Sequence, residues 1–187
     1  MRTFKNLCLS FLFLGLAACS GGGGGGSDIT ESGFSGPDPI KVTITAQKTT
    51  LPANLQHFLP DLGSPFTTEV TVEVQRADGS PIPNGTPVQM QVDNISVGGV
   101  TKLDDPDTDD FNEFLGCRIE NNVVVLESCT LFGALDNETS SGKATYFFTS
   151  SDQPGTARLT ATATDPNSGK QVKATLDITV ISSAGTG

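Results

Sequence analysis

Carboxylates crowd one short stretch of the sequence, "DDPDTDDFNEF" at residues 104–114. The candidate binding residues of this stretch are Asp104, Asp105, Asp107, Asp109, Asp110, Phe111 and Glu113. Carboxylates in a D-x-D-x-D pattern are typical calcium ligands, but an EF-type loop starting at Asp105 needs glycine at its sixth position and glutamate at its twelfth. The sequence has Asp110 and Gly116 there. We therefore expect a solvated acidic loop with no metal. The alternative is a looser calcium site on Asp105, Asp107, Asp109 and Asp110, completed by Glu113 or backbone carbonyls.

Outside the acidic stretch, few residues of the sequence indicate catalytic chemistry. His57 is the single histidine, and its neighbours "LQ" and "FLP" indicate a half-packed residue of an apolar loop. No G-x-S-x-G or H-E-x-x-H motif occurs, and nucleophilic catalysis needs a base beside the attacking group. Two acidic residues could still converge in the fold as they do in a glycosidase. We expect no catalytic residues and rank an enzyme last among the function classes.

The amino terminus is typical of an export signal. Arg2 and Lys5 precede the apolar run "LCLSFLFLGLAA", which is too short to span a bilayer. The following "LAAC" resembles the bacterial lipobox, so residues 1–18 would be removed and Cys19 acylated. That resemblance implies anchoring in a lipid bilayer through Cys19, and Ser20 after it implies the outer membrane, with the periplasmic or surface face left open. Two or three acyl chains make such an anchor effectively permanent.

Residues 19–39 form a tether between the acylated cysteine and the first strand. Six consecutive glycines and the flanking serines resist ordering. Without residues 1–18, nine basic residues face 21 acidic ones, a net charge of −12. That balance disfavours nucleic acid and anionic lipid surfaces as partners. It suits a basic partner or a cation.

Two cysteines, Cys117 and Cys129, stay in the exported part once Cys8 leaves with the signal and Cys19 takes lipid. In an exported chain such a pair forms a disulfide. Closing a loop of this size contributes about 3 kcal/mol in the chain-entropy model.

Alternating apolar residues run from Ile40 onward and predict an all-β antiparallel sandwich. The alternating sets are Ile40, Val42, Ile44 and Ala46; Val70, Val72 and Val74; Val88, Met90 and Val92; Ala144, Tyr146 and Phe148; Ala157, Leu159, Ala161 and Ala163; and Val172, Ala174, Leu176, Ile178 and Val180. Turn sequences such as "ADGSPIPNG" and "DPNSG" separate them. One domain over residues 40–182, with a tail at 183–187, is the economical organisation.

Three segments also resemble the bacterial Ig-like domain of the invasin and intimin type. They are "LPAN" at 51–54, "EVTVEVQRADGSPIPNGTPVQMQV" at 69–92 and "SGKATYFFTSSDQPGTARLTATAT" at 141–164. The resemblance implies an Ig-like β-sandwich. Members of that family typically carry tandem modules on a membrane barrel, whereas here a single module follows a lipid anchor. No receptor-binding residue of the family maps onto this chain.

Two insertions depart from the family pattern, "NLQHFLPDLGSPF" at 54–66 and a long segment of about 94–140. The second holds ten acidic residues against Lys102 and Arg118, a net charge of −8. Its β-prone run "NNVVVLESCTLFGAL" predicts one or two further strands. These strands could extend a sheet edge or form an exposed binding rim. The first alternative is favoured because proteins usually cover unpaired edges.

Together these features predict a non-catalytic lipoprotein that presents one Ig-like domain for adhesion or envelope interaction with an unknown protein or glycan. The binding loop would be the acidic stretch 104–113. The alternative function is a periplasmic accessory component of an envelope assembly or polysaccharide system.

Overall fold

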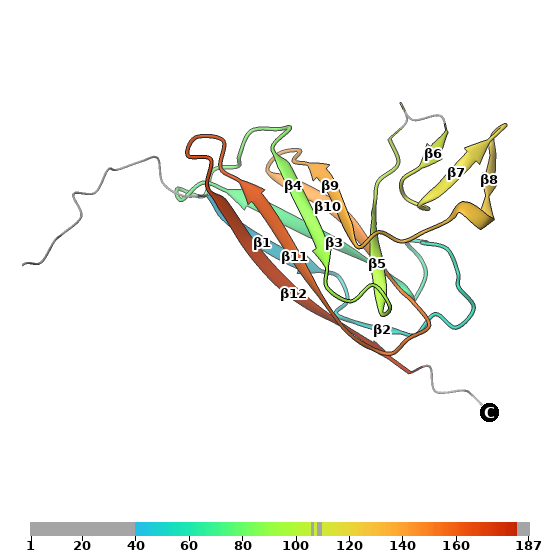
Figure 1. Cartoon of the computed structure of the whole chain (residues 1–187). Coiled ribbons are helices and arrows are strands. Elements are labelled where there is room, and N and C mark those ends of the chain that lie inside the picture. Colours follow the sequence, from blue (N-terminus) through green and yellow to red (C-terminus); the bar gives the residue numbers. More distant parts are fainter. Residues whose placement is uncertain (1–39, 106, 108–109, 183–187) are drawn as a thin grey trace, which may run out of the picture. The chain divides into compact units, whose positions relative to one another are not determined.

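The computed structural model describes residues 40–105, 107 and 110–182 (Figure 1). Residues 1–39, among them Cys19 and the tether, lie outside the described residues, as do Asp109 and the tail. The described chain is an Ig-like sandwich, as the alternation predicts, and its strands pair antiparallel except for β2, which is parallel to β12. In this part of the chain the one helical element is the 3-10 turn η1 (Leu126–Ser128), so no described helix is long and apolar enough to cross a membrane.

Two sheets form the sandwich. The four-stranded sheet has the order β1 (Lys41–Ala46), β3 (Thr67–Gln75), β10 (Lys143–Ser150), β5 (Gly98–Lys102). The five-stranded sheet has the order β2 (Thr50–Pro52), β12 (Gln171–Ile181), β11 (Gly155–Thr164), β4 (Pro87–Val92), β9 (Ala134–Glu138). A third, small sheet contains β6 (Phe111–Asn112), β7 (Cys117–Glu120) and β8 (Val123–Val125).

The predicted alternating faces form the core between the two large sheets. Val70, Val72 and Val74 of β3 and Val88 and Met90 of β4 have no exposed surface. Burying an aliphatic side chain of this size stabilises the fold by about 1.5–3 kcal/mol. The ends of two predicted sets, Ala46 and Val92, and the first half of β12 are only partly buried and pack against the edge of this core.

Both sides of the sandwich are closed by chain segments that switch sheets. On one side the chain leaves β1, which pairs antiparallel with β3, and enters β2, which pairs parallel with β12. On the other side Phe132 exchanges two backbone hydrogen bonds with Val100 of β5, and the chain then continues into β9, which pairs with β4. Such switching leaves little unpaired edge for other strands.

The projecting part of the second insertion is shorter than the expected range 94–140. Residues 98–102 are strand β5 and residues 134–138 are strand β9, both within the large sheets. The described residues between 103 and 133 project beyond the sandwich, and we call them the projecting segment (Figure 1). Gly98 and Gly99 begin strand β5, and a Cβ on Gly98 would lie 2.4 Å from Cζ of Phe148. The two glycines are therefore packing sites within a strand.

Candidate functional site

The two insertions meet at one end of the sandwich and enclose a pocket of about 270 Å³. One wall comes from the connection between β2 and β3, the other from the projecting segment, and the floor from the end of β10. The lining residues are Asn54, His57, Phe58, Leu59, Pro60, Leu115, Leu126, Cys129, Thr130, Leu131, Ser150 and Ser151. Both insertions are recognisable in the sequence, but no local pattern brings them together, because strands β3 and β4 lie between them in the chain.

A buried asparagine holds the first wall. Asn54 is almost fully buried, and its backbone N–H donates to the carbonyl of Ser151 over 2.7 Å. Its side chain accepts from the N–H of Phe58 over 2.9 Å and donates to the carbonyl of Phe58 over 2.8 Å. The Phe58 ring stacks on Phe66 at a centroid distance of 5.6 Å. The connection is therefore an ordered loop with a defined face toward the pocket.

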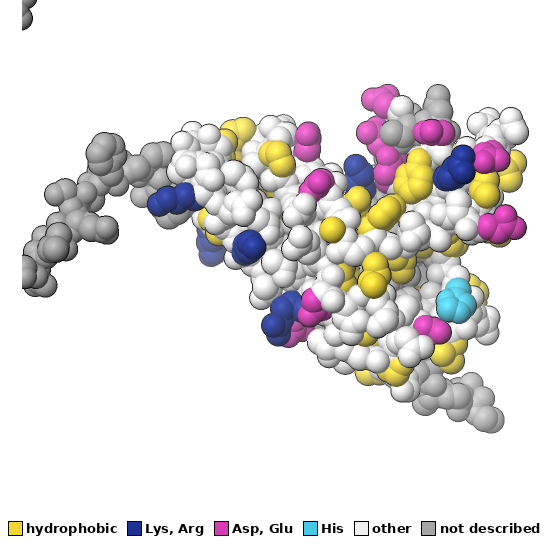
Figure 2. Space-filling model, viewed as in Figure 1, with side chains coloured by type: hydrophobic (Ala, Val, Ile, Leu, Met, Phe, Trp, Pro, Cys, Tyr) yellow, Lys and Arg dark blue, Asp and Glu magenta, His cyan; other side chains and the backbone are white. Residues whose placement is uncertain are grey.

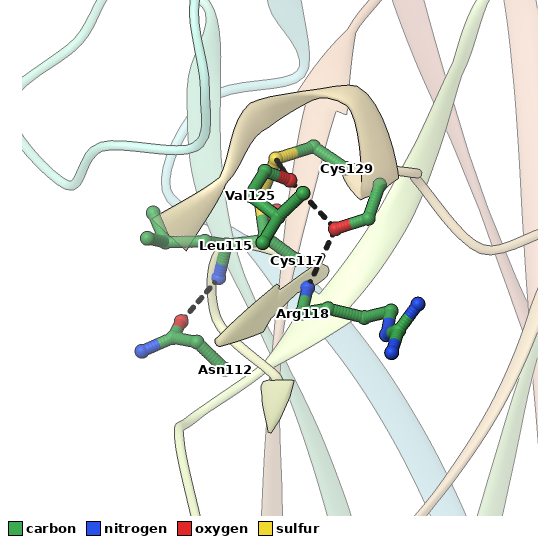
Figure 3. Close-up of a disulfide and its surroundings, with 7 residues drawn as sticks. Asn112, Leu115, Cys117, Arg118, Val125 and Cys129 are labelled. Carbon is green, nitrogen blue, oxygen red and sulfur yellow. Dashed lines mark hydrogen bonds between the residues drawn. A yellow bond between two sulfur atoms is a disulfide. The ribbon is translucent and has the colours of Figure 1, made fainter. Parts of the chain in front are cut away.

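The disulfide between Cys117 and Cys129 holds the second wall (Figure 3). It joins β7 to the residue after η1, and the two Cα atoms are 4.0 Å apart. Beside it the Ser128 hydroxyl accepts from the N–H of Arg118 over 2.8 Å and donates to the carbonyl of Val125 over 2.6 Å. The predicted pairing of the two cysteines is thus present in the structure. Because Cys129 also lines the pocket, the bond fixes the wall itself.

Gly116 lets the backbone of this wall close. It has φ of +67°, and a Cβ there would lie 2.1 Å from the carbonyl oxygen of Thr130. The same two residues are joined by a 2.9 Å hydrogen bond from the N–H of Thr130 to the carbonyl of Gly116. The residue that fails the EF pattern at its twelfth position therefore has a structural role next to the disulfide.

An aromatic contact fastens the projecting segment to the outer face of the four-stranded sheet. The ring of Phe114 packs edge-on against Phe147 of β10 at 4.9 Å, whereas the contact of Phe111 with Phe132 at 6.2 Å lies within the segment. Phe147 points away from the sandwich core yet is only 2% exposed. Three adjacent apolar residues of β10, "YFF", indicate a strand that is covered on both faces. The alternating pattern alone does not use this signal.

The carboxylates at the start of the acidic stretch bind its own backbone. Asp104 accepts from the N–H of Glu113 over 3.0 Å and from the side chain of Asn112 over 2.9 Å. Glu113 accepts from the N–H of Asp105, and Asp105 accepts from the N–H of Asp107, both over 3.0 Å. Partial burial, together with the charges of Glu113 and Asp105, raises the pKa of Asp104. These acids organise the loop in which they lie.

No group of three or more His, Cys, Asp or Glu side chains is arranged to hold a metal ion among the described residues. Of the four calcium candidates, Asp105 lines a second hollow of about 430 Å³ with Asp136 and Glu138 of β9 and with Lys102. Asp109 lies outside the described residues. An acidic loop without metal stays the prediction for this stretch, and calcium binding stays its alternative to be tested.

The pocket is apolar and carries no Asp, Glu, Lys or Arg in its lining. Leu126 and Phe58 are 68% and 52% exposed at its rim. Figure 2 shows hydrophobic atoms between the projecting segment and the sandwich, with the histidine at the edge of this region. Acidic side chains gather over the projecting segment on the same face.

The polar groups of the pocket are directed to the main chain. The Ser150 hydroxyl donates to the carbonyl of Pro52 over 2.8 Å, and the Ser151 hydroxyl donates to the carbonyl of Ser96. Neither hydroxyl group therefore donates a hydrogen bond to His57, although Ser150, Ser151 and His57 all line the pocket. An exposed apolar rim around a small hollow is suited to binding a side chain of another molecule.

No protein-family model matches the sequence, and no curated protein matches it. Solved structures with similar backbones include a β-glycosidase from Bacteroides vulgatus, with a TM-score of 0.45 and 15% identity over 77% of this chain and 14% of that chain. Another is the D00-D0 domain of intimin, with a TM-score of 0.43 and 17% identity over 78% and 49%. A third, from AAF fimbriae of enteroaggregative Escherichia coli, has a TM-score of 0.35 and 11% identity over 75% and 100%. The chain thus spans less than half of the first two, and likenesses at this level assign neither a family nor an activity.

Proposed function

We propose that this protein is a non-catalytic, membrane-anchored interaction module of the bacterial envelope. Cys19 would carry the lipid, residues 20–39 the tether, and the Ig-like sandwich the binding end. The observation that carries the proposal is the meeting of the two insertions around an apolar pocket at one end of the sandwich. The sequence resemblance to invasin- and intimin-type domains supports adhesion or envelope contact as the role.

The pocket lies at the end of the sandwich opposite to the one at which the chain enters β1. The chain enters β1 at Lys41, which pairs with Gln75 at the last position of β3. The pocket residues instead adjoin Thr67, at the first position of β3, and Ser150, at the last position of β10. A domain held at its entry end would present the pocket away from the membrane.

The anchor is tested by a Cys19→Ser variant of the full chain, expressed in a Gram-negative host and followed by membrane fractionation. We expect the wild-type protein in the outer-membrane fraction and the variant in the soluble fraction. If the variant stays in the membrane, the lipid anchor is wrong. Protease treatment of intact cells separates surface display from the periplasmic accessory role.

The binding end is tested by photo-crosslinking in intact cells. A photoreactive amino acid at Leu126, on the pocket rim, should give a discrete adduct. The same amino acid at Lys173, on β12 near the entry end, is the matched control and should not. Identical adducts at both positions, or none at Leu126, would count against the pocket end as the contact surface.

A further inference from the structure

The pocket combines a mainly apolar lining that holds no Asp, Glu, Lys or Arg with acidic residues next to that lining in the chain. We propose that it receives a positively charged polypeptide segment that inserts one large apolar side chain. This inference rests on the proposed function and names the chemistry of the partner.

The size of the pocket matches a side chain rather than a larger ligand. Its volume of about 270 Å³ lies below the range of about 300–1,000 Å³ that is usual for small-molecule sites. Leu126 of the projecting segment and Phe58 of the connection between β2 and β3 are both exposed, and Leu115 and Leu131 line the pocket with them. Apolar residues around a small hollow are the usual setting for a buried anchor residue of a partner.

Acidic residues flank the lining at three points of the chain. Asp61 follows the lining residue Pro60, Glu127 follows Leu126, and Asp152 follows Ser151. The basic residue of β7, Arg118, is paired with Glu120 at 3.4 Å. The pocket end therefore carries a negative potential, which attracts and orients a basic partner.

Charge argues against four other occupants. A second copy would bring the same net charge of −12 to the same surface, so self-association through the pocket is opposed. The tether, residues 20–39, holds Asp28, Glu31 and Asp38 without a basic residue and joins the opposite end of the sandwich. Nucleic acids and anionic lipid surfaces are repelled for the same reason.

The types and exposure of the aromatic residues argue against a glycan as the occupant of the pocket. Sugar rings stack on flat, exposed aromatic side chains with a polar edge, above all those of Trp and Tyr. The chain has no tryptophan, and its single tyrosine, Tyr146, has no exposed surface. Aliphatic side chains and phenylalanine suit the apolar side chains of a polypeptide.

The test uses the full-length protein in detergent and, as probes, a displayed library of random short peptides and a glycan array. We expect the enriched peptides to combine Lys or Arg with a large apolar residue. We also expect the affinity of a synthetic enriched peptide to fall as salt is raised. A Leu126→Ser variant should lose affinity by about tenfold or more, as removal of an anchor contact does.

Val123→Ser is the matched control, because Val123 is 64% exposed on the same small sheet but does not line the pocket. We expect no loss of affinity for this variant. The proposal is overturned if enriched peptides lack basic residues, if both variants bind equally well, if no peptide is enriched, or if glycans alone bind. Those outcomes leave the anchoring and crosslinking results of the proposed function unaffected, so the two can fail separately.

Discussion

At the scale of single residues, Tyr146 is a buried side chain that joins the two sheets. It lies on β10, in the four-stranded sheet, and its hydroxyl donates to the carbonyl of Val88 on β4 over 2.6 Å. Burial, and next the charge of Asp136, raise its pKa well above the usual value of 10.0. A raised pKa means that the native state favours the neutral phenol. Its contribution to stability is therefore complete below pH 10 and is lost as the pH rises from there toward the folded pKa.

Alkaline titration should show this directly, because the chain has one tyrosine and no tryptophan. We expect phenolate absorbance to appear only together with the loss of β-sheet circular dichroism, at a pH above about 10. In denaturant the same group should titrate near its usual value, which supplies the reference. Phenolate formation near pH 10 in a protein that keeps its native dichroism would contradict the burial of this hydroxyl.

Gly98 sits where a methyl group cannot be accommodated. Its added Cβ would approach the carbonyl oxygen of Thr149 to 2.5 Å as well as the ring of Phe148. We expect Gly98→Ala to lower the free energy of unfolding by about 1–3 kcal/mol, the usual cost of overpacking. Denaturant unfolding measures the change. Gly63→Ala is the control, since the nearest atom there would be 3.8 Å away, and its midpoint should not move; equal midpoints for both variants would refute the packing argument.

At the scale of elements, the projecting segment is held together by its own disulfide and its own strand pairing. The disulfide closes a loop within this segment, and β6, β7 and β8 pair only with one another. Its ties to the sandwich include the aromatic contact with Phe147, the backbone pairing of Phe132 with Val100, and the hydrogen bond from the N–H of Val92 to the carbonyl of Gly133. This arrangement makes local opening possible without loss of the core.

Reduction of the disulfide should therefore loosen the segment and leave the sandwich folded. We expect backbone amides of β7 and β8 to lose protection in hydrogen exchange, while those of β3, β10 and β11 keep it. A Cys117→Ser, Cys129→Ser variant without reductant should behave in the same way. Simultaneous loss of protection in all of these strands would show that the disulfide supports the whole fold.

The acidic stretch allows a simple test of the calcium alternative. The carboxylates of Asp104 and Asp105 accept hydrogen bonds from the loop itself, which occupies oxygens that a cation would need. We therefore expect millimolar calcium to leave the melting temperature unchanged, with magnesium at the same ionic strength as control. A calcium-specific rise would establish a cation site, because a ligand that binds only the folded state raises its stability.

At the scale of the whole molecule, charge and strand pairing both oppose self-association. The two chain segments that switch sheets cover edges of the sandwich. The outer strand β9 carries Asp136 and Glu138. Charged side chains on an edge strand discourage pairing with another chain. The net charge of −12 without the signal adds general repulsion.

We accordingly expect the protein without its lipid, the Cys19→Ser variant, to be a monomer. Sedimentation velocity at low and moderate salt measures this, and the higher salt controls for masking by charge repulsion. A dimer that persists in Leu126→Ser would identify an interface away from the pocket. A dimer that Leu126→Ser abolishes would instead make a second copy the occupant of the pocket.

The sequence alone was sufficient for the sandwich, its alternating core faces and the cysteine pair. The pleat of a strand places every second side chain on one face, so burial in β3, β4 and β11 follows from local order. The sheet memberships of β5 and β9 were not predictable in this way. A glycine pair resembles a turn until the ring of Phe148 is known to lie against it.

The existence and the lining of the pocket depend on the tertiary structure. Asn54 binds the backbone at Ser151, and Phe114 packs on Phe147, across long stretches of chain that no local pattern relates. Those long-range contacts bring the connection at 54–66 to the projecting segment, and they shift attention from the aspartates to the apolar hollow beside the disulfide. Periodicity records which face of a strand is buried, whereas the meeting of two loops depends on how the whole sandwich folds.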